Sequence, residues 1–212
     1  MAATAGVAAL LVLGARRRGE AWATPAGRWL AVVMLAGFAG EQLTYALRGD
    51  WSVEVNLPFQ LTDAVTLAAI VALWRPEWVL LVELVYFWAL TASLQAVLTP
   101  DLDESFPDPL FLTYFATHSG AVAAACLLVL GSRRTPRPGA ACRAYAVTAA
   151  FAVVAAAATV LTGGNYMFLR RKPVDGSLLD HMGPWPVYIA AGAAVGLLSF
   201  LALAALAGRI RH

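Results

Sequence analysis

The stretch LFLTYFATHSGAVAAACLLVL, residues 110–130, decides the fold of this chain. It holds 21 consecutive residues without Asp, Glu, Lys or Arg, and a helix of about 20 such residues crosses the hydrocarbon core of a bilayer. His118 lies inside the stretch, roughly two turns from its start. Because a polar side chain is costly to keep inside a membrane, His118 is a candidate functional residue.

The rest of the chain extends this pattern. It is 60% hydrophobic and 13% charged, with a mean hydropathy of +0.70, whereas soluble domains are about 45–50% apolar and about 25% charged. Further apolar runs occupy residues 29–47, 58–74, 78–98, 141–161 and 185–207. We therefore predict an all-α fold, a polytopic membrane bundle of six to seven transmembrane helices that forms one integral domain over residues 1–212.

A seventh candidate span, residues 2–14, is short. A secretory signal carries its positive charge before the apolar stretch, whereas Arg16, Arg17 and Arg18 follow this one. We therefore expect a first span, with its outer end missing because the start codon was assigned late.

The basic residues predict an orientation. Eleven of the 15 Lys and Arg residues fall in segments that face inward if the N-terminus is outside. Short cytoplasmic loops collect Arg and Lys, so we predict an N-out, C-in membrane protein. The net charge of +2 then gives no reason to expect nucleic-acid binding, and membrane lipids are the predicted partners. No metal-ligand spacing such as His-x-x-x-His occurs, and we predict no metal and no cofactor.

Polar side chains on several spans fall at one depth, in the outer half of the predicted membrane. This set comprises Glu41, Gln60, Thr62, Asp63, Gln95, Tyr114 and His118. Gln95 shares a helix face with Thr91, four residues earlier. Asn165 and Tyr166 begin the long outer loop, and Asp180 lies near its end. We predict that these side chains line a cavity that opens toward the outer leaflet.

Each of these residues also has a purely structural interpretation. Glutamine amides commonly bond across helices in membrane bundles, and Asp63 is close enough to the start of its span to cap the helix. A buried, neutral His118 can pack against a carboxylate without any catalytic role. Glu83 lies in the inner part of its span, where we expect a structural pairing with Arg75 or with a basic residue of another loop.

The long outer loop carries a resemblance to a known family. Its motifs are GGNYMFLRRKP at residues 163–173, SLLD at 177–180 and GPWP at 183–186, and they follow ELVYFW at 83–88 and LQAVLTPD at 94–101. In this order, from about residue 57 onward, they resemble the YwaF-type bacterial integral membrane proteins, which implies a location in the inner (cytoplasmic) membrane of a bacterium. The chain is more distantly similar to an animal multi-spanning phospholipid acyltransferase family and to the androgen-induced hydrolases of fatty-acid esters of hydroxy fatty acids.

The resemblance implies lipid acyl chemistry. Those relatives pair a Cys or Thr nucleophile on one span with a His on another, and His118 matches the histidine. In the acyltransferase a Cys-His pair follows a proline, whereas Pro58 is followed here by Phe59 and Gln60. Other bacterial members carry Leu-His-Leu-Cys-Asp after that proline, which places Thr62 at the position of their Cys. The expected cysteine nucleophile is thus absent.

Two functions follow from the resemblance, and a third from the charges alone. The chain is an acyltransferase or acyl-ester hydrolase, with Thr62 as nucleophile and His118 as base, or a degenerate relative that binds lipid. In the catalytic interpretation, Asp63 or Glu41 orients the imidazole, and Asn165 and Gln95 donate to an oxyanion. The alternative is a small-solute or proton-coupled transporter, in which Glu41, Asp63, His118, Asp180 and His181 form a proton relay. A purely structural bundle also remains open.

Overall fold

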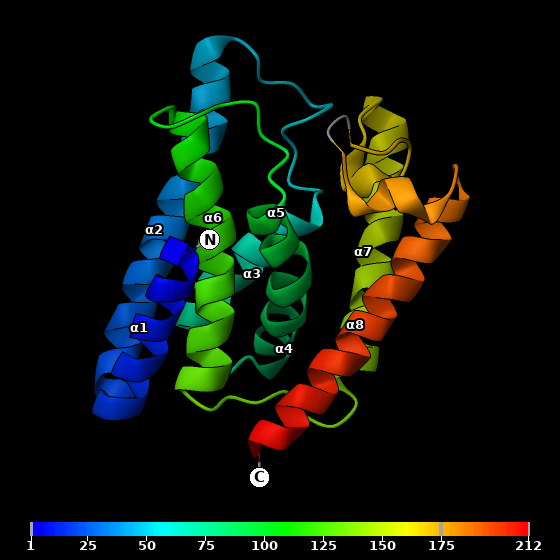
Figure 1. Ribbon diagram of the computed structural model, residues 1–212. Helices are drawn as coiled ribbons and strands as arrows, with labels where there is room; N and C mark the ends of the chain where they lie inside the picture. The colour runs from blue at the N-terminus through cyan, green and yellow to red at the C-terminus, as the bar shows by residue number, and fades with distance from the viewer. Residues whose placement is uncertain (1, 174–175, 212) are drawn as a thin grey trace.

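The computed structural model describes residues 2–173 and 176–211, and it is a helical bundle (Figure 1). The predicted all-α fold is confirmed, since no strand occurs within those ranges. In chain order the helices are α1 (Ala2–Arg18), α2 (Glu20–Arg48), α3 (Leu61–Trp74), α4 (Val79–Trp88), the π-helix η1 (Ala89–Ser93), α5 (Leu94–Leu98), α6 (Pro109–Ala125), the π-helix η2 (Cys126–Gly131), α7 (Ala140–Thr162) and α8 (Val187–Arg211). Two 3-10 turns, η3 (Tyr166–Phe168) and η4 (Leu178–Met182), lie in the loop before α8.

Five helical segments are long and apolar enough to cross a membrane. They are Glu20–Arg48, Val79–Leu98, Pro109–Gly131, Ala140–Thr162 and Val187–Ile210, and the apolar helix α3 is shorter. The protein is therefore a multi-pass membrane protein. Helix α2 begins at Glu20, before the apolar run at residue 29, because residues 20–28 continue the same helix.

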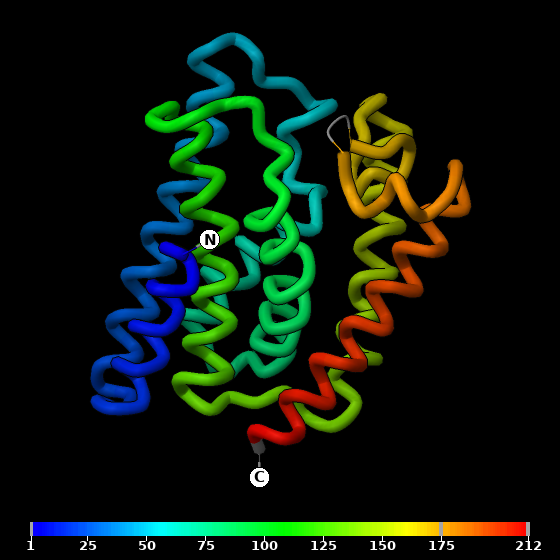
Figure 2. The backbone as a smooth tube through the Cα atoms, viewed as in Figure 1, coloured from blue at the N-terminus to red at the C-terminus, as the bar shows by residue number. Residues whose placement is uncertain are grey.

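The chain reverses direction repeatedly, so that the turns after α1, α3 and α6 and the C-terminus lie at one end of the bundle (Figure 2). That end carries most of the arginines. It is called the arginine-rich end below, and the prediction that it faces the cytoplasm rests on these charges. The outer-loop segments lie at the opposite end.

Close packing of α2 against α6 positions the helix that carries His118. A Cβ atom added to Gly120 would lie 2.6 Å from Met34 Cγ, and one added to Gly37 would lie 3.1 Å from Ala116 Cβ. Glycine lets the two backbones approach this closely, as is common between membrane helices. The middle parts of α2 and α6 are thereby held together.

A buried ion-pair cluster joins α4 to α7 and to the loop before it. The Glu83 side chain is only 1% exposed, and its Oε1 accepts hydrogen bonds from Arg137 Nε at 2.9 Å and Arg143 Nη2 at 2.9 Å. The expected pairing of Glu83 with a basic residue of another loop is confirmed. Arg75 is not that residue, because it pairs with Glu77 at 3.6 Å on the surface.

Candidate functional site

The candidate site is built around two aromatic rings on α6. Tyr114 and His118 are four residues apart and therefore lie on the same face of the helix, with their ring centroids 4.1 Å apart. The Tyr114 hydroxyl donates a hydrogen bond to the Ala96 carbonyl of α5 at 3.0 Å. This bond fixes which face of α6 points toward α5, the helix that lies beside it (Figure 1).

The hydrogen bonds of Thr117 favour one tautomer of the His118 ring. The Thr117 hydroxyl lies 3.0 Å from the Thr113 carbonyl and 3.1 Å from the Tyr114 carbonyl. When its single proton is donated to one of these carbonyls, the Thr117 oxygen accepts from His118 Nδ1, which is 3.2 Å away. Nδ1 then carries the ring proton of the neutral imidazole, and Nε2 keeps a free lone pair. Nε2 has no hydrogen-bond partner within the described residues, which leaves it available as a base.

A buried serine lies at the same depth. Helices α5 and α6 run in opposite directions, and the bond from Tyr114 to Ala96 sets their register. One turn deeper, this register places His118 level with Ser93 in the π-helix η1. Ser93 is 0% exposed, and its Oγ is a buried side-chain atom for which the described residues provide no partner. Single π-turns often occur at functional sites, and an unpaired buried hydroxyl calls for an explanation.

Two acidic residues, from α2 and α3, lie close to each other, and the one on α2 also lies close to the Tyr114 ring. Glu41 is half-buried and interacts electrostatically with both Asp63 and Tyr114. Asp63 also accepts a hydrogen bond from the Gln60 backbone N–H at 3.1 Å, so it caps the first turn of α3. The adjacent Thr62 hydroxyl has no hydrogen-bond partner in the described part of the chain. Glu41 thus links Asp63 of α3 to Tyr114 of α6, whose ring contacts His118.

Comparison with known proteins identifies the family. Residues 1–204 match the TMEM164 family. The chain belongs to this family. No curated protein and no solved structure matches the chain.

In this TMEM164-family protein, the predicted side-chain amides bond elsewhere. Gln95 is exposed and donates to Thr99 Oγ1 at 2.7 Å, and Gln60 Oε1 accepts from the Met167 backbone N–H at 2.8 Å. Asn165 Nδ2 donates to the Arg171 carbonyl at 2.8 Å. Gln95 and Asn165 thus stabilise local turns, whereas Gln60 joins the start of α3 to the loop before α8. The structure does not bring Gln95 or Asn165 to His118.

The acidic end of the outer loop is also engaged locally. Asp180 Oδ2 accepts from the Ser177 backbone N–H at 2.7 Å, and the Ser177 hydroxyl accepts in turn from Leu179 N at 3.2 Å. This is the hydrogen-bond pattern of a helix N-terminus. Asp180 and His181 are both exposed. The structure therefore gives Asp180 a capping role in the loop of this TMEM164-family member.

Tyr166 holds the outer loop against the segment before α3. It is 0% exposed, donates to the Val53 carbonyl at 2.6 Å and accepts from Leu57 N at 3.2 Å. Its ring meets Phe59 edge to face at 5.4 Å. Burial raises the pKa of the Tyr166 phenol, so the hydroxyl stays protonated and continues to donate near neutral pH.

Removal of the Tyr166 hydroxyl is expected to loosen this loop. Tyr166→Phe leaves the Val53 carbonyl and the Leu57 N–H without their partner, which costs about 1–3 kcal/mol of unfolding free energy. Denaturant unfolding of the protein in detergent micelles measures the loss. Tyr145→Phe is the matched control, because the Tyr145 hydroxyl has no hydrogen-bond partner in the described ranges. Equal stability of the two variants would contradict the role assigned to Tyr166.

Proposed function

We propose that this TMEM164-family protein transfers or hydrolyses the acyl chains of membrane lipids, with His118 Nε2 as the general base. The observation that carries the proposal is the hydrogen-bond pattern at Thr117, which leaves Nε2 with a free lone pair. A base that takes the proton of an attacking hydroxyl is a central requirement of acyl transfer through an ester intermediate. The position of His118, roughly two turns into an apolar helix, suits a substrate that enters from lipid.

The reaction has two balanced steps. A side-chain hydroxyl oxygen attacks the ester carbonyl of a phospholipid, and its proton passes to His118 Nε2. The carbon–oxygen bond to the lysophospholipid breaks, and the imidazolium returns the proton to the departing oxygen. An acceptor hydroxyl then attacks the acyl-protein ester in the same way, which restores the side-chain hydroxyl. Water as the acceptor gives hydrolysis.

Two hydroxyls compete for the role of nucleophile. Thr62 is supported by its unpartnered hydroxyl and by its place beside Asp63, which interacts with Glu41 near Tyr114. Ser93 is supported by its unpartnered, buried Oγ at the depth of His118. A primary hydroxyl is less hindered than that of threonine, whereas Thr62 is more accessible, being only half-buried. The proposal therefore predicts that one of these two residues carries the acyl group.

The test uses the purified protein with a phospholipid carrying a fluorescent acyl chain, and with a lysophospholipid as acceptor. We expect transfer of the label to the acceptor, and mass spectrometry after rapid quenching should find the acyl group on Thr62 or Ser93. Thr62→Val and Ser93→Ala separate the candidates, because only the loss of the true nucleophile abolishes turnover. Binding of the labelled lipid without transfer or release would overturn catalysis and leave the lipid-binding interpretation.

The transporter hypothesis has less structural support. A proton relay needs titratable groups that continue toward the other side of the membrane. Glu83, which lies toward the arginine-rich end, is held by Arg137 and Arg143. Asp180 is bound to its own loop. Neither group is poised to pass a proton to or from His118.

A further inference from the structure

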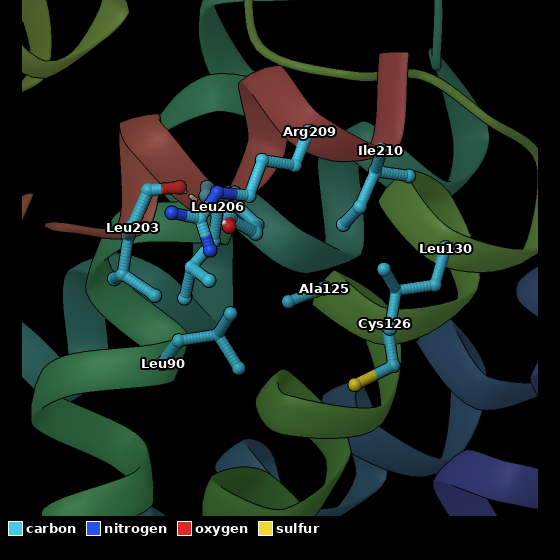
Figure 3. Close-up of a pocket in the computed structure, with 9 residues that line it drawn as sticks. Leu90, Ala125, Cys126, Leu130, Leu203, Leu206, Arg209 and Ile210 are labelled. Atoms are coloured by element: carbon cyan, nitrogen blue, oxygen red, sulfur yellow. Dashed lines mark hydrogen bonds between the residues drawn. The ribbon is translucent and has the colours of Figure 1, made fainter. Parts of the chain in front are cut away.

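An apolar groove of about 330 Å³ opens on the surface of the bundle between α4 with η1, α6 with η2, and α8. Figure 3 shows that leucine side chains from all three segments, the Cys126 thiol and the Arg209 side chain surround it. The residues used below are Leu90, Cys126, Leu130, Leu203, Leu206 and Arg209. Its lining is almost entirely hydrocarbon, so its occupant presents an apolar chain to it.

The tilt of α8 creates this groove near the arginine-rich end. There α8 is attached to α4 by a hydrogen bond from the Tyr86 hydroxyl to the Leu203 carbonyl, 2.9 Å long. The rings of Phe87 and Phe200 add a contact with centroids 5.1 Å apart. Beyond these contacts the helix is largely exposed, and Leu206 is 50% exposed. The groove thus lies open to the lipid that surrounds a membrane protein.

Arg209 supplies a charge at the end of the groove. Four other arginines at this end pair with an acid: Arg134 with Glu20, Arg75 with Glu77, and Arg137 and Arg143 with Glu83. Arg209 has no acidic partner within the described residues. In Figure 3 its guanidinium lies beside Leu203 and Leu206 at the groove. An uncompensated arginine at a helix end attracts anionic headgroups.

We propose that this groove binds an anionic phospholipid of the leaflet at the arginine-rich end. One acyl chain lies along Leu206, Leu203 and Leu90, and the phosphate pairs with Arg209, near the last turn of α8. Guanidinium groups bind phosphate oxygens through two parallel hydrogen bonds. The site is separate from the proposed catalytic centre, because Cys126 follows His118 by eight residues, roughly 12 Å along the helix.

The two free cysteines allow a direct test on the intact protein. Cys126 lines the groove and Cys142 is exposed elsewhere. In detergent micelles, phosphatidylglycerol at several times its Kd should slow N-ethylmaleimide labelling of Cys126 about fivefold, and Cys142 should react at an unchanged rate. Phosphatidylcholine should protect much less, and glycerol phosphate should not protect at all.

Substitutions separate the contribution of the Arg209 charge to lipid binding from the contribution of the acyl-chain contacts. Arg209→Gln should abolish the preference for phosphatidylglycerol, whereas Arg17→Gln removes an exposed charge at the same end and should preserve it. Leu203→Trp fills the groove, and native mass spectrometry should then find no retained phosphatidylglycerol. Equal protection by the two phospholipids would overturn the anionic site, since any acyl chain would then suffice. Protection by glycerol phosphate alone would overturn it in favour of a soluble phosphate ligand.

Discussion

His118→Ala is expected to lower the rate of acyl transfer by about 10²–10⁴-fold, the usual contribution of a positioned general base. The base accepts a proton only as the nucleophile attacks, so its loss should reduce kcat and leave KM nearly unchanged. The measurement is the transfer of a labelled acyl chain from phospholipid to lysophospholipid in mixed micelles. Wild-type turnover in His118→Ala would contradict the base assignment.

Thr117 provides a finer test of the same assignment. Thr117→Val removes the oxygen that accepts from His118 Nδ1, so the ring proton is no longer held away from Nε2. We expect a smaller fall in kcat than for His118→Ala, together with a changed pH–rate profile. Thr113→Val is the matched control, because the Thr113 hydroxyl bonds the Leu110 carbonyl at 3.1 Å and does not bond the imidazole. An unchanged profile in Thr117→Val would remove Thr117 as a positioning residue.

The fold and the depth of His118 could be predicted because both depend on local sequence. Apolar runs of about 20 residues define spans, and counting residues from a span end gives depth. That reasoning brought His118, Tyr114, Glu41 and Asp63 to one level, and the structure shows the Tyr114 ring against His118 and Glu41 close to Tyr114 and Asp63. The capping interpretation of Asp63 also follows from position alone, since the residue lies in the first turn of its helix.

The π-helix η1 could not be predicted from the sequence, and it changes the side of the helix on which two residues, Gln95 and Ser93, lie. Its wider turn rotates the residues that follow relative to an unbroken α-helix. Gln95, which follows η1, is exposed and bonds Thr99, although α-helical spacing aligned it with Thr91. Ser93 gave no signal in the sequence, because serine is unremarkable in a membrane helix and its missing partner is visible only in three dimensions.

The hydrogen-bond partners of the outer loop could not be predicted from the sequence either. Tyr166 bonds backbone groups of Val53 and Leu57, more than a hundred residues earlier in the chain. Asn165 was expected at the cavity, yet its amide bonds the Arg171 carbonyl within its own loop. A motif predicts that such residues are ordered, but it does not say which backbone groups they meet.

The double substitution Arg137→Ala/Arg143→Ala is expected to cost about 3–5 kcal/mol of stability, because it leaves the buried Glu83 carboxylate without its two cations. Glu83 is 1% exposed, whereas its partners are 52% and 40% exposed. The charge left without a partner in the double variant would therefore be the buried one, the Glu83 carboxylate. The cluster is also one of the few links from α4 to α7, beside the bond from Trp88 to Thr148 at 2.7 Å.

A third substitution distinguishes the cost of an unpaired buried charge from the cost of a simple loss of contacts. Glu83→Leu in the double-substituted background removes the buried charge at similar volume and should recover most of the lost stability, since apolar replacements of buried ion pairs are often neutral. Arg75→Ala is the surface control. It breaks a pair whose side chains are 66% and 58% exposed, for which about 0–1 kcal/mol is expected. Denaturant unfolding in one detergent compares all the variants. If Glu83→Leu recovers nothing, the arginines stabilise the bundle through their own packing, and Glu83 is not the centre of the cluster.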